Sequence, residues 1–161
     1  TFADAASKAG IDGSIIVDLP PEEDAPLREL YTQRGLSVIR LATPTTDEHR
    51  AAKVSEGASG FIYFVAVTGV TGAGSADPAA IAGQVAMVKR VSGLPVCVGF
   101  GVKSGAQAAE MAKIADGVVV GSAFVEKAGD AHATGRFKAA APAMGALARE
   151  LRVAIDSVRK A

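Results

Sequence analysis

Residues 113–126 read KIADGVVVGSAFVE, and this stretch contains every part of one structural unit. Its centre, 117–121, is a continuous apolar run, which is typical of a strand buried on both faces of a parallel sheet. The glycine at the start of the run lets the chain turn tightly out of a helix and into the strand. Gly121 and Ser122 follow, and we expect residues 122–126 to form a short helix.

The same unit recurs along the chain. The predicted strands are Ser14–Leu19, Ser37–Ala42, Phe61–Val67, Pro95–Phe100 and Gly117–Gly121. Helices are predicted between them from apolar spacings of three and four, marked by Leu27, Leu30 and Tyr31, by Ile81, Val85 and Val88, and by Ala108, Met111 and Ala112. Residues 143–160 are predicted to form a closing helix. Five βα units are therefore expected in order.

Helix starts and strand starts carry their own signals. Prolines and early acids at 20–23, Asp77 with Pro78, and Ser104 are typical of helix N-termini. Residues 9–13, 56–60 and 113–117 share one pattern, in which a helix stops and a glycine opens the next strand.

Alternating strands and helices predict an α/β fold with a parallel sheet, either a barrel or an open doubly wound sheet. No G-x-G-x-x-G follows a strand, which lowers the case for the dinucleotide-binding open sheet. A complete (β/α)8 barrel needs eight strands and about 250 residues. We therefore expect residues 1–161 to be a single, partial TIM-barrel domain with open edges that make it fragile or dependent on a partner. The chain opens at Thr1 within a helical pattern, which indicates a fragment.

Composition excludes several classes of partner. Seventeen basic and seventeen acidic residues cancel, so no basic field is available for nucleic acid or an anionic membrane. Apolar runs are far shorter than the roughly 18 to 20 residues of a membrane helix, and no signal peptide is recognisable at Thr1. The single cysteine, Cys97, is expected to be a buried, inert thiol. A cytoplasmic location fits these features best.

In parallel α/β proteins the functional groups lie in the loops after the strands. The loops after the last two predicted strands are rich in glycine and hydroxyl groups, including Gly101, Gly121 and Ser122. Glycines let peptide N–H groups approach an anion, and a helix that begins there adds its positive dipole end. A phosphate site between these two loops is the expected function, although each glycine on its own is also explained by turn geometry.

Five strings in order along the whole chain resemble those of the tryptophan synthase α chain family. They are Val17–Glu23, Arg40–Asp47, Thr68–Ala73, Val98–Val102 and Asp116–Ala123. By this resemblance the chain would hold strands four to eight of the family's barrel, with Phe2–Gly10 as the end of the third helix.

The resemblance implies a lyase of tryptophan biosynthesis that cleaves indole-3-glycerol phosphate to indole and glyceraldehyde 3-phosphate. It implies phosphate binding by Gly72, Gly101, Gly121 and Ser122, and an indole pocket formed by Tyr63, Phe100, Val17 and Leu41. Thr71 would orient a catalytic carboxylate. For Tyr63, a plain core role stays open. The expected partner is a β subunit that carries pyridoxal phosphate, in an α2β2 assembly, while this chain itself is expected to need no cofactor and no metal.

The cleavage needs carboxylates with tuned pKa values as proton donors and acceptors. In the family one Glu and one Asp serve, from a region expected to precede Thr1, so no catalytic residue is expected in this chain. Asp18 is the acid at the end of a predicted strand, and its place before Leu-Pro-Pro favours a helix cap or a subunit interface over catalysis. Asp12 and Asp116 fall at the opposite face, where residues serve stability.

Three other side chains have ordinary explanations. His49 and His132 lack partners at metal-ligand spacing and are expected on the surface. Lys103 could assist an anion, but a solvated lysine in a first helical turn is the simpler expectation.

Two alternative functions remain at this point. One is a non-catalytic barrel fragment or folding module that keeps a phosphate site. The other is a different phosphate-binding barrel enzyme, an isomerase or an FMN-using oxidoreductase. Both as part of a lyase like the tryptophan synthase α chain and as a non-catalytic barrel fragment, the isolated chain is expected to be inactive.

Overall fold

A computed structural model describes residues 1–66, 77–99 and 101–159. Within these residues the strands are β1 (Gly13–Ile15), β2 (Ser37–Ala42), β3 (Ile62–Val65), β4 (Val96–Gly99) and β5 (Gly117–Val119). The helices are α1 (Phe2–Lys8), α2 (Ala25–Thr32), α3 (Glu48–Ser55), α4 (Pro78–Ser92), α5 (Gly105–Ala112), α6 (Ser122–Ala133) and α7 (Phe137–Arg159). Every neighbouring pair of strands is parallel.

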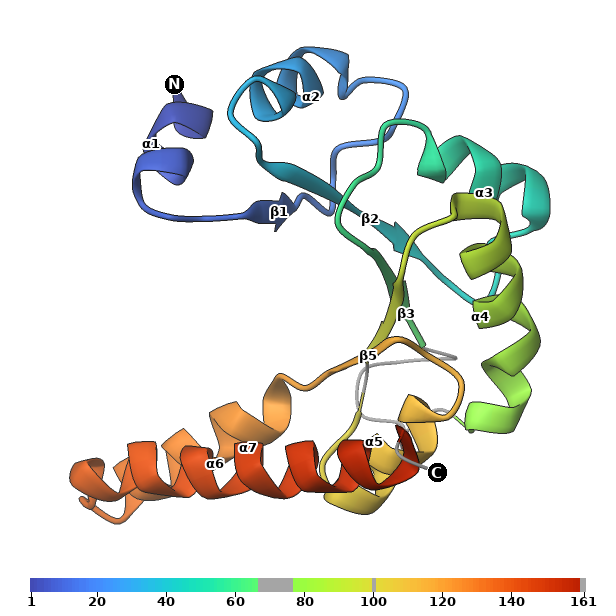
Figure 1. The fold of residues 1–161 in the computed structure, drawn as a ribbon. Helices are drawn as coiled ribbons and strands as arrows, with labels where there is room; N and C mark the ends of the chain where they lie inside the picture. Colours follow the sequence, from blue (N-terminus) through green and yellow to red (C-terminus); the bar gives the residue numbers. More distant parts are fainter. Residues whose placement is uncertain (67–76, 100, 160–161) are drawn as a thin grey trace.

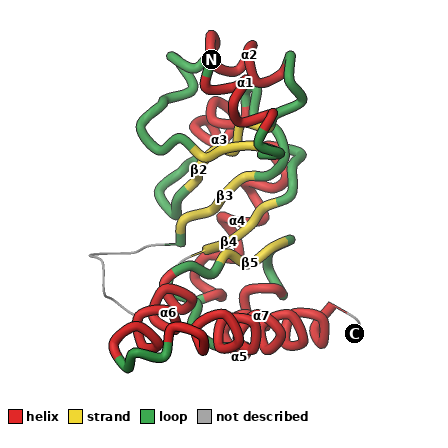
Figure 2. The backbone as a smooth tube through the Cα atoms, turned by 90° about the vertical axis from the view of Figure 1, so that its left-hand side faces the viewer, coloured by secondary structure: helices red, strands yellow, loops and turns green. Residues whose placement is uncertain are grey.

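The sheet is an open arc with strand order β1-β2-β3-β4-β5 (Figures 1 and 2). In Figure 1, α3 and α4 cover its outer side, α1 and α2 lie beyond one end, and α5, α6 and α7 lie beyond the other. A doubly wound sheet reverses its strand order at a switch point, whereas this order runs in one direction without reversal. The structure is therefore part of a (β/α)8 barrel with five βα units, as the sequence predicted.

The core lies between the sheet and its outer helices. Ile62, Phe64, Val96 and Val98 are fully buried and pack with residues of α4 and α5. The residues between them, Tyr63 and Cys97 among others, are only partly buried, because side chains alternate between the two faces of a strand. The outer faces of β2, β3 and β4 are therefore buried as predicted, whereas most side chains on the concave face are only partly buried. On the concave face the described residues leave apolar side chains partly exposed.

The strand starts show two different uses of glycine. Gly60 has a φ of +77°, the left-handed conformation that the pattern predicts. Gly117 has no such φ, but a Cβ there would lie 2.5 Å from the Cys97 Sγ atom on β4. A glycine at position 117 is explained by the close approach of β4 and β5. The sequence pattern did not distinguish this close approach from a turn.

The helix starts agree with the sequence at two of three places. Asp77 accepts a hydrogen bond from the Ala79 N–H (3.0 Å), and Ser104 accepts one from the Gln107 N–H (3.4 Å). The acids and prolines at 20–23 do not begin α2, because the Glu23 N–H bonds to the Pro20 carbonyl in a separate turn and the helix begins after Asp24. Asp18 lies before that turn and does not cap α2, so of its two predicted roles the helix cap is wrong and the subunit interface stays a prediction.

The closing helix is longer than predicted, because α7 begins at Phe137 and accommodates Pro142. Leu147, Leu151 and Ile155 form its buried stripe at spacings of four. This stripe packs α7 against the core beside α5 and α6. The α6 helix is also longer than the few residues expected. No helix among the described residues is long and apolar enough to cross a membrane.

At the opposite edge from the loops that follow the strands, Asp116 links three elements. Its carboxylate accepts hydrogen bonds from the Val96 N–H (3.0 Å) and from the Lys89 ammonium (2.6 Å), and the Arg159 guanidinium donates to its carbonyl. Burial raises the pKa of Asp116. The hydrogen bonds from Lys89 and Val96 and the charges of Lys89 and Arg159 lower this pKa by more than burial raises it, so the net shift is downward. A structural role at this face agrees with the sequence prediction.

We expect Asp116→Asn to lower the free energy of unfolding at pH 7 by about 1 kcal/mol, because a charge-assisted hydrogen bond is lost. A carboxyl group whose pKa is lowered on folding stabilises the fold above its ordinary pKa of 3.8, and this contribution is lost as pH falls through the folded value. Urea unfolding at pH 7 and at pH 3 should therefore show a smaller acid loss in the variant than in the parent. Glu110→Gln, which removes an exposed ion pair with Lys113, is the control. An unchanged acid loss in Asp116→Asn would contradict this role.

Candidate functional site

The carboxyl ends of the five parallel strands meet at one edge of the sheet, and the candidate site lies there. Thr71, Gly72 and Phe100, which the sequence assigned to this site, lie outside the described residues. Gly101, Gly121 and Ser122 are placed, as are Val17, Leu41 and Tyr63.

The loops after β4 and β5 start side by side. Gly99 and Val119 are register partners at the ends of these two strands. Gly101 has a φ of +71°, which favours glycine, and it follows β4 by two residues. Gly121 has an ordinary negative φ, and a Cβ built on it would meet no atom within 4 Å among those described. Neither backbone conformation nor packing within the described chain explains a glycine at position 121.

The two helices that follow these loops begin differently. At α5, the Ser104 hydroxyl accepts from the Gln107 N–H, the Gln107 side chain accepts from the Lys103 N–H (2.8 Å), and Glu150 of α7 accepts from the Gly105 N–H (2.9 Å). Side chains of the protein thus occupy the start of α5. At α6, the N-cap residue is Gly121 and no side chain caps the helix in the described structure. The exposed start of α6 therefore offers peptide N–H groups and a positive dipole end to an anion.

Lys103 connects the two loops. Its ammonium forms a 2.7 Å ion pair with the Glu126 carboxylate of α6, and both side chains are exposed. Lys103 is thus exposed, as the sequence predicted, and its charge is directed toward Glu126.

Tyr63 lies on the concave face of β3, not in the core beneath the sheet. A Cβ on Gly99 would lie 2.5 Å from the Tyr63 hydroxyl and 2.9 Å from the Val119 Cβ, so the Tyr63 ring crosses β4 where Gly99 leaves room. Burial raises the pKa of Tyr63. The sequence analysis did not single out Gly99. The sequence feature that could have indicated the role of Gly99 is a glycine at the end of a β-branched run, directly before Phe100.

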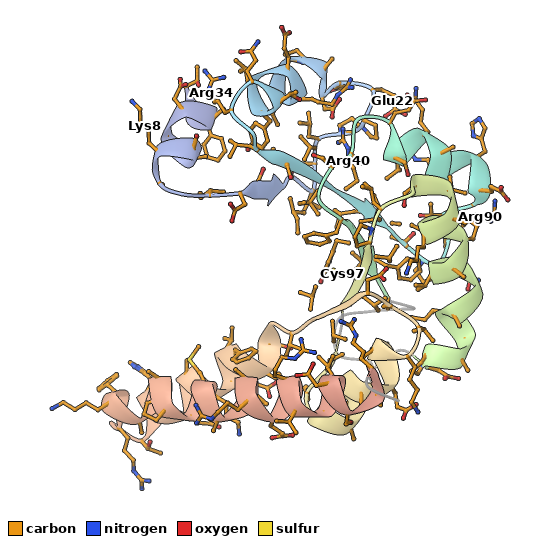
Figure 3. All side chains as sticks on the ribbon, viewed as in Figure 1. Lys8, Glu22, Arg34, Arg40, Arg90 and Cys97 are labelled. Atoms are coloured by element: carbon orange, nitrogen blue, oxygen red, sulfur yellow. The ribbon has the colours of Figure 1, made fainter. Side chains whose placement is uncertain are left out.

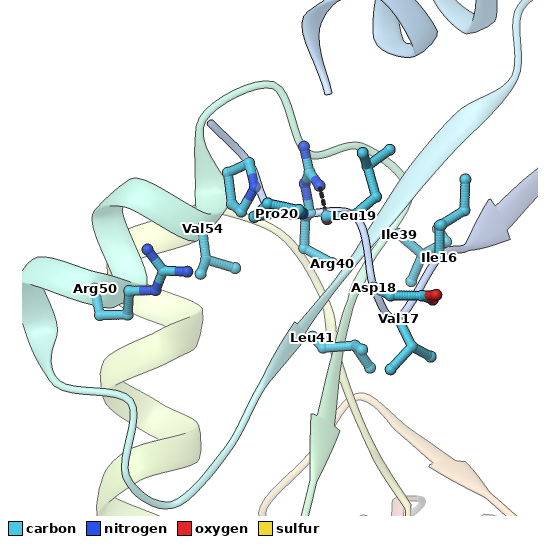
Figure 4. A pocket seen from close by; sticks show the side chains of 11 residues that line it. Ile16, Val17, Asp18, Leu19, Pro20, Ile39, Arg40, Leu41, Arg50 and Val54 are labelled. Atoms are coloured by element: carbon cyan, nitrogen blue, oxygen red, sulfur yellow. Dashed lines mark hydrogen bonds between the residues drawn. The ribbon is translucent and has the colours of Figure 1, made fainter. Parts of the chain in front are cut away.

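Val17 and Leu41 line one cavity of about 340 Å³ at the ends of β1 and β2 (Figure 4). Residues 16–21 form one wall, residues 39–41 another, and Arg50 and Val54 of α3 complete it. Leu41 and Tyr63 are register partners on neighbouring strands. Of the three proposed indole-pocket residues with described positions, Leu41 and Tyr63 lie on adjacent strands and Val17 lies in the turn after β1. Asp18 also lines this cavity and is exposed.

A buried ion pair next to this cavity was missed by the sequence analysis. Arg40 of β2 is 5% exposed and pairs with Asp24, which is 1% exposed. Burial lowers the pKa of Arg40, opposed by the charge of Glu22. The sequence feature that indicates this pair is an arginine in the middle of the apolar run Ser37–Ala42. The strand prediction did not consider it.

The remaining candidates have structural surroundings. Cys97 lies on the concave side of β4 and is partly buried (Figure 3), and burial, with the charge of Asp116, raises its pKa. His49 and His132 are exposed, and the His132 ring packs edge-on against Phe137 with centroids 5.0 Å apart. No cluster of three or more metal-ligating side chains occurs in the described parts of the chain.

Comparisons with known proteins agree with this arrangement. The family model for the tryptophan synthase alpha chain matches residues 1–155. A curated alpha chain from Caulobacter sp. (strain K31) is 54% identical over 127 residues, covering 79% of this chain and 46% of the relative. The alpha chain of Zymomonas mobilis is 51% identical over 99% of this chain and 58% of the relative. The chain thus spans about half the length of the curated relatives it matches.

Solved structures show the same likeness in three dimensions. The alpha subunit of tryptophan synthase from Legionella pneumophila superposes with a TM-score of 0.84 at 36% identity, covering 97% of this chain and 56% of that one. A Mycobacterium tuberculosis tryptophan synthase structure gives a TM-score of 0.80 at 38% identity, covering 96% and 55%. Because the family model matches residues 1–155, nearly the whole of this chain, the chain belongs to the tryptophan synthase alpha chain family.

Proposed function

We propose that this chain forms the phosphate site and part of the indole site of a lyase that cleaves indole-3-glycerol phosphate. The observation that carries the proposal is the uncapped start of α6 beside the Gly101 loop, in a chain that matches the family over residues 1–155. The products would be indole and glyceraldehyde 3-phosphate, as part of tryptophan biosynthesis.

The phosphate would be bound by Gly101, Gly121 and Ser122. A phosphate ester at the start of α6 would accept hydrogen bonds from peptide N–H groups and from the Ser122 hydroxyl. The open space at the missing Gly121 Cβ supports a ligand there. The capped start of α5 argues against the alternative position one helix earlier. Gly72 would join this site from outside the described residues.

The indole ring would lie on the concave face. Tyr63 of β3 and Leu41 of β2 present apolar surface on neighbouring strands, Val17 adds to it from the turn after β1, and Phe100 would add a fourth side chain. Apolar side chains such as these suit an aromatic ligand, and the cavity that Val17 and Leu41 line also contains the charged groups of Asp18, Arg40 and Arg50.

In the cleavage, the bond between indole C3 and the glycerol chain breaks, C3 gains a proton, and the adjacent glycerol hydroxyl loses its proton to become the aldehyde. These proton transfers need carboxylates, and we assign none of them to this chain. Thr71 would support a carboxylate that comes from another part of the protein. We further propose a β subunit carrying pyridoxal phosphate as the partner that receives indole, in an α2β2 assembly, with no cofactor bound by this chain.

Glycerol 3-phosphate tests the phosphate site in the complete natural polypeptide that contains this chain. We expect saturating ligand to raise its melting temperature, because a ligand that binds the folded state alone stabilises it by about 2.7 kcal/mol at 100 times Kd. Ser122→Asp should abolish this shift through charge repulsion, while without ligand the variant stays as stable as the parent, since an acid suits a helix N-terminus.

Ser104→Asp makes the same change at the start of α5 and should keep the ligand-dependent shift. Equal ligand shifts in Ser122→Asp and the parent would refute the phosphate assignment. No shift in the parent would favour a non-catalytic barrel fragment without a formed anion site.

Gly99→Ala tests the position of Tyr63. The added methyl group would displace the Tyr63 ring and the Val119 side chain, so we expect indole to bind about tenfold more weakly. Gly83→Ala on α4 is the control, since a Cβ there meets no described atom within 4 Å. Calorimetric titration with indole checks both variants, and unchanged indole affinity in Gly99→Ala would exclude Tyr63 from the indole pocket.

A further inference from the structure

Arg40 is one member of a buried ion pair and also lines the cavity of the proposed indole pocket. Its guanidinium pairs with the Asp24 carboxylate, and its Nη1 donates to the Leu19 carbonyl (3.4 Å) (Figure 4). Asp24 also pairs with Arg28 at 3.4 Å. One arginine of β2 therefore touches both ends of the segment 19–24.

This ion pair is not explained by stability alone. Removing two charges from water costs free energy that their attraction only partly offsets, and well-packed apolar side chains of similar volume often serve as well. Both partners lie in the interior, with Asp24 1% and Arg40 5% exposed. A buried pair of charges is an expensive way to fill a space between a sheet and a helix.

The pair does fix a segment that carries functional side chains. Residues 16–21 form a wall of the 340 Å³ cavity, and Val17 on this wall is 77% exposed. Arg40 points toward the helices, whereas the next residue, Leu41, points to the concave face, since successive side chains alternate. A second, exposed ion pair between Glu22 and Arg50 (2.9 Å) joins the same segment to α3. Strand β2 thus supplies Leu41 to the cavity and, through Arg40, holds the wall that faces Leu41.

We propose that Arg40 and Asp24 are positioning residues, which set the distance between the Val17 wall and Leu41 and so determine the fit of the indole ring. This inference rests on the proposed function, because it assumes that indole binds between these walls. Neither side chain has a hydrogen bond or ion pair to Gly101, Gly121 or Ser122 in the described part of the chain, so we expect the effect to be confined to the indole half of the site.

The test separates position from stability with three variants of the complete natural polypeptide. Arg40→Met leaves Asp24 buried without its main partner and should lower the melting temperature. Arg40→Met with Asp24→Leu removes both charges and should restore the melting temperature toward that of the parent. If the pair positions the wall, the double variant should still bind indole about tenfold more weakly, while its affinity for glycerol 3-phosphate stays within about twofold of the parent.

Arg40→Lys guards against a double variant that fails to fold. Lysine keeps a charge for Asp24 but lacks the planar fork that reaches the carbonyl of Leu19 at the same time. It should leave folding intact and weaken indole binding without weakening glycerol 3-phosphate binding. Arg90→Gln, which breaks an exposed 3.0 Å pair with Glu48, is the matched control and should change neither ligand affinity.

Two outcomes would overturn the inference. Full indole affinity in the refolded double variant and in Arg40→Lys would show that the pair serves stability only. Equal loss of both ligands would show a general disturbance and not a positioned wall. Failure of the parent itself to bind indole or glycerol 3-phosphate would instead count against the proposed function, so the two failures are distinguishable.

Discussion

Ile62, Phe64, Val96 and Val98 are fully buried between the sheet and its outer helices, and the rest of the structure depends on this one-sided burial. The chain returns through a helix between successive strands, so the strands run parallel, and these helices pack against one face of the sheet. All five carboxyl ends then meet at one edge. The proposed site follows from this arrangement, because Gly101, Gly121 and Ser122 come from loops far apart in sequence that begin on paired strands.

We propose that the two helix starts at that edge serve different roles, one in structure and one in binding. Three side chains occupy the start of α5, and one of them, Glu150, comes from the closing helix α7. The start of α6 has no side-chain cap in the described structure and faces open space at Gly121. On the concave face, Tyr63 and Leu41 are left partly exposed by the same alternation that buries Ile62 and Phe64. Packing on one face of the sheet therefore leaves the other face available for the proposed ligand.

Much of this could be predicted from sequence, since continuous apolar runs and helical spacings identify the βα units, and Asp77 and Ser104 mark helix starts. The misses have physical causes. The N-cap residue of α2 is Asp24, because residues 20–23 form a proline-rich turn before the helix. At Gly99 and Gly117 a larger residue would crowd Tyr63 and Cys97 on neighbouring strands, and local sequence does not contain these contacts. The Arg40 and Asp24 pair joins residues sixteen positions apart, so only the folded chain reveals it.

The central claim is that an anion binds at the uncapped start of α6 beside the Gly101 loop. Amide chemical shifts of the complete natural polypeptide, labelled with nitrogen-15 and titrated with glycerol 3-phosphate, test it most directly. We expect the amide signals of Gly101, Gly121, Ser122 and Ala123 to shift together with one saturation curve. Shifts confined to the start of α5 at residues 104–107, or no saturable shift at either helix, would contradict it.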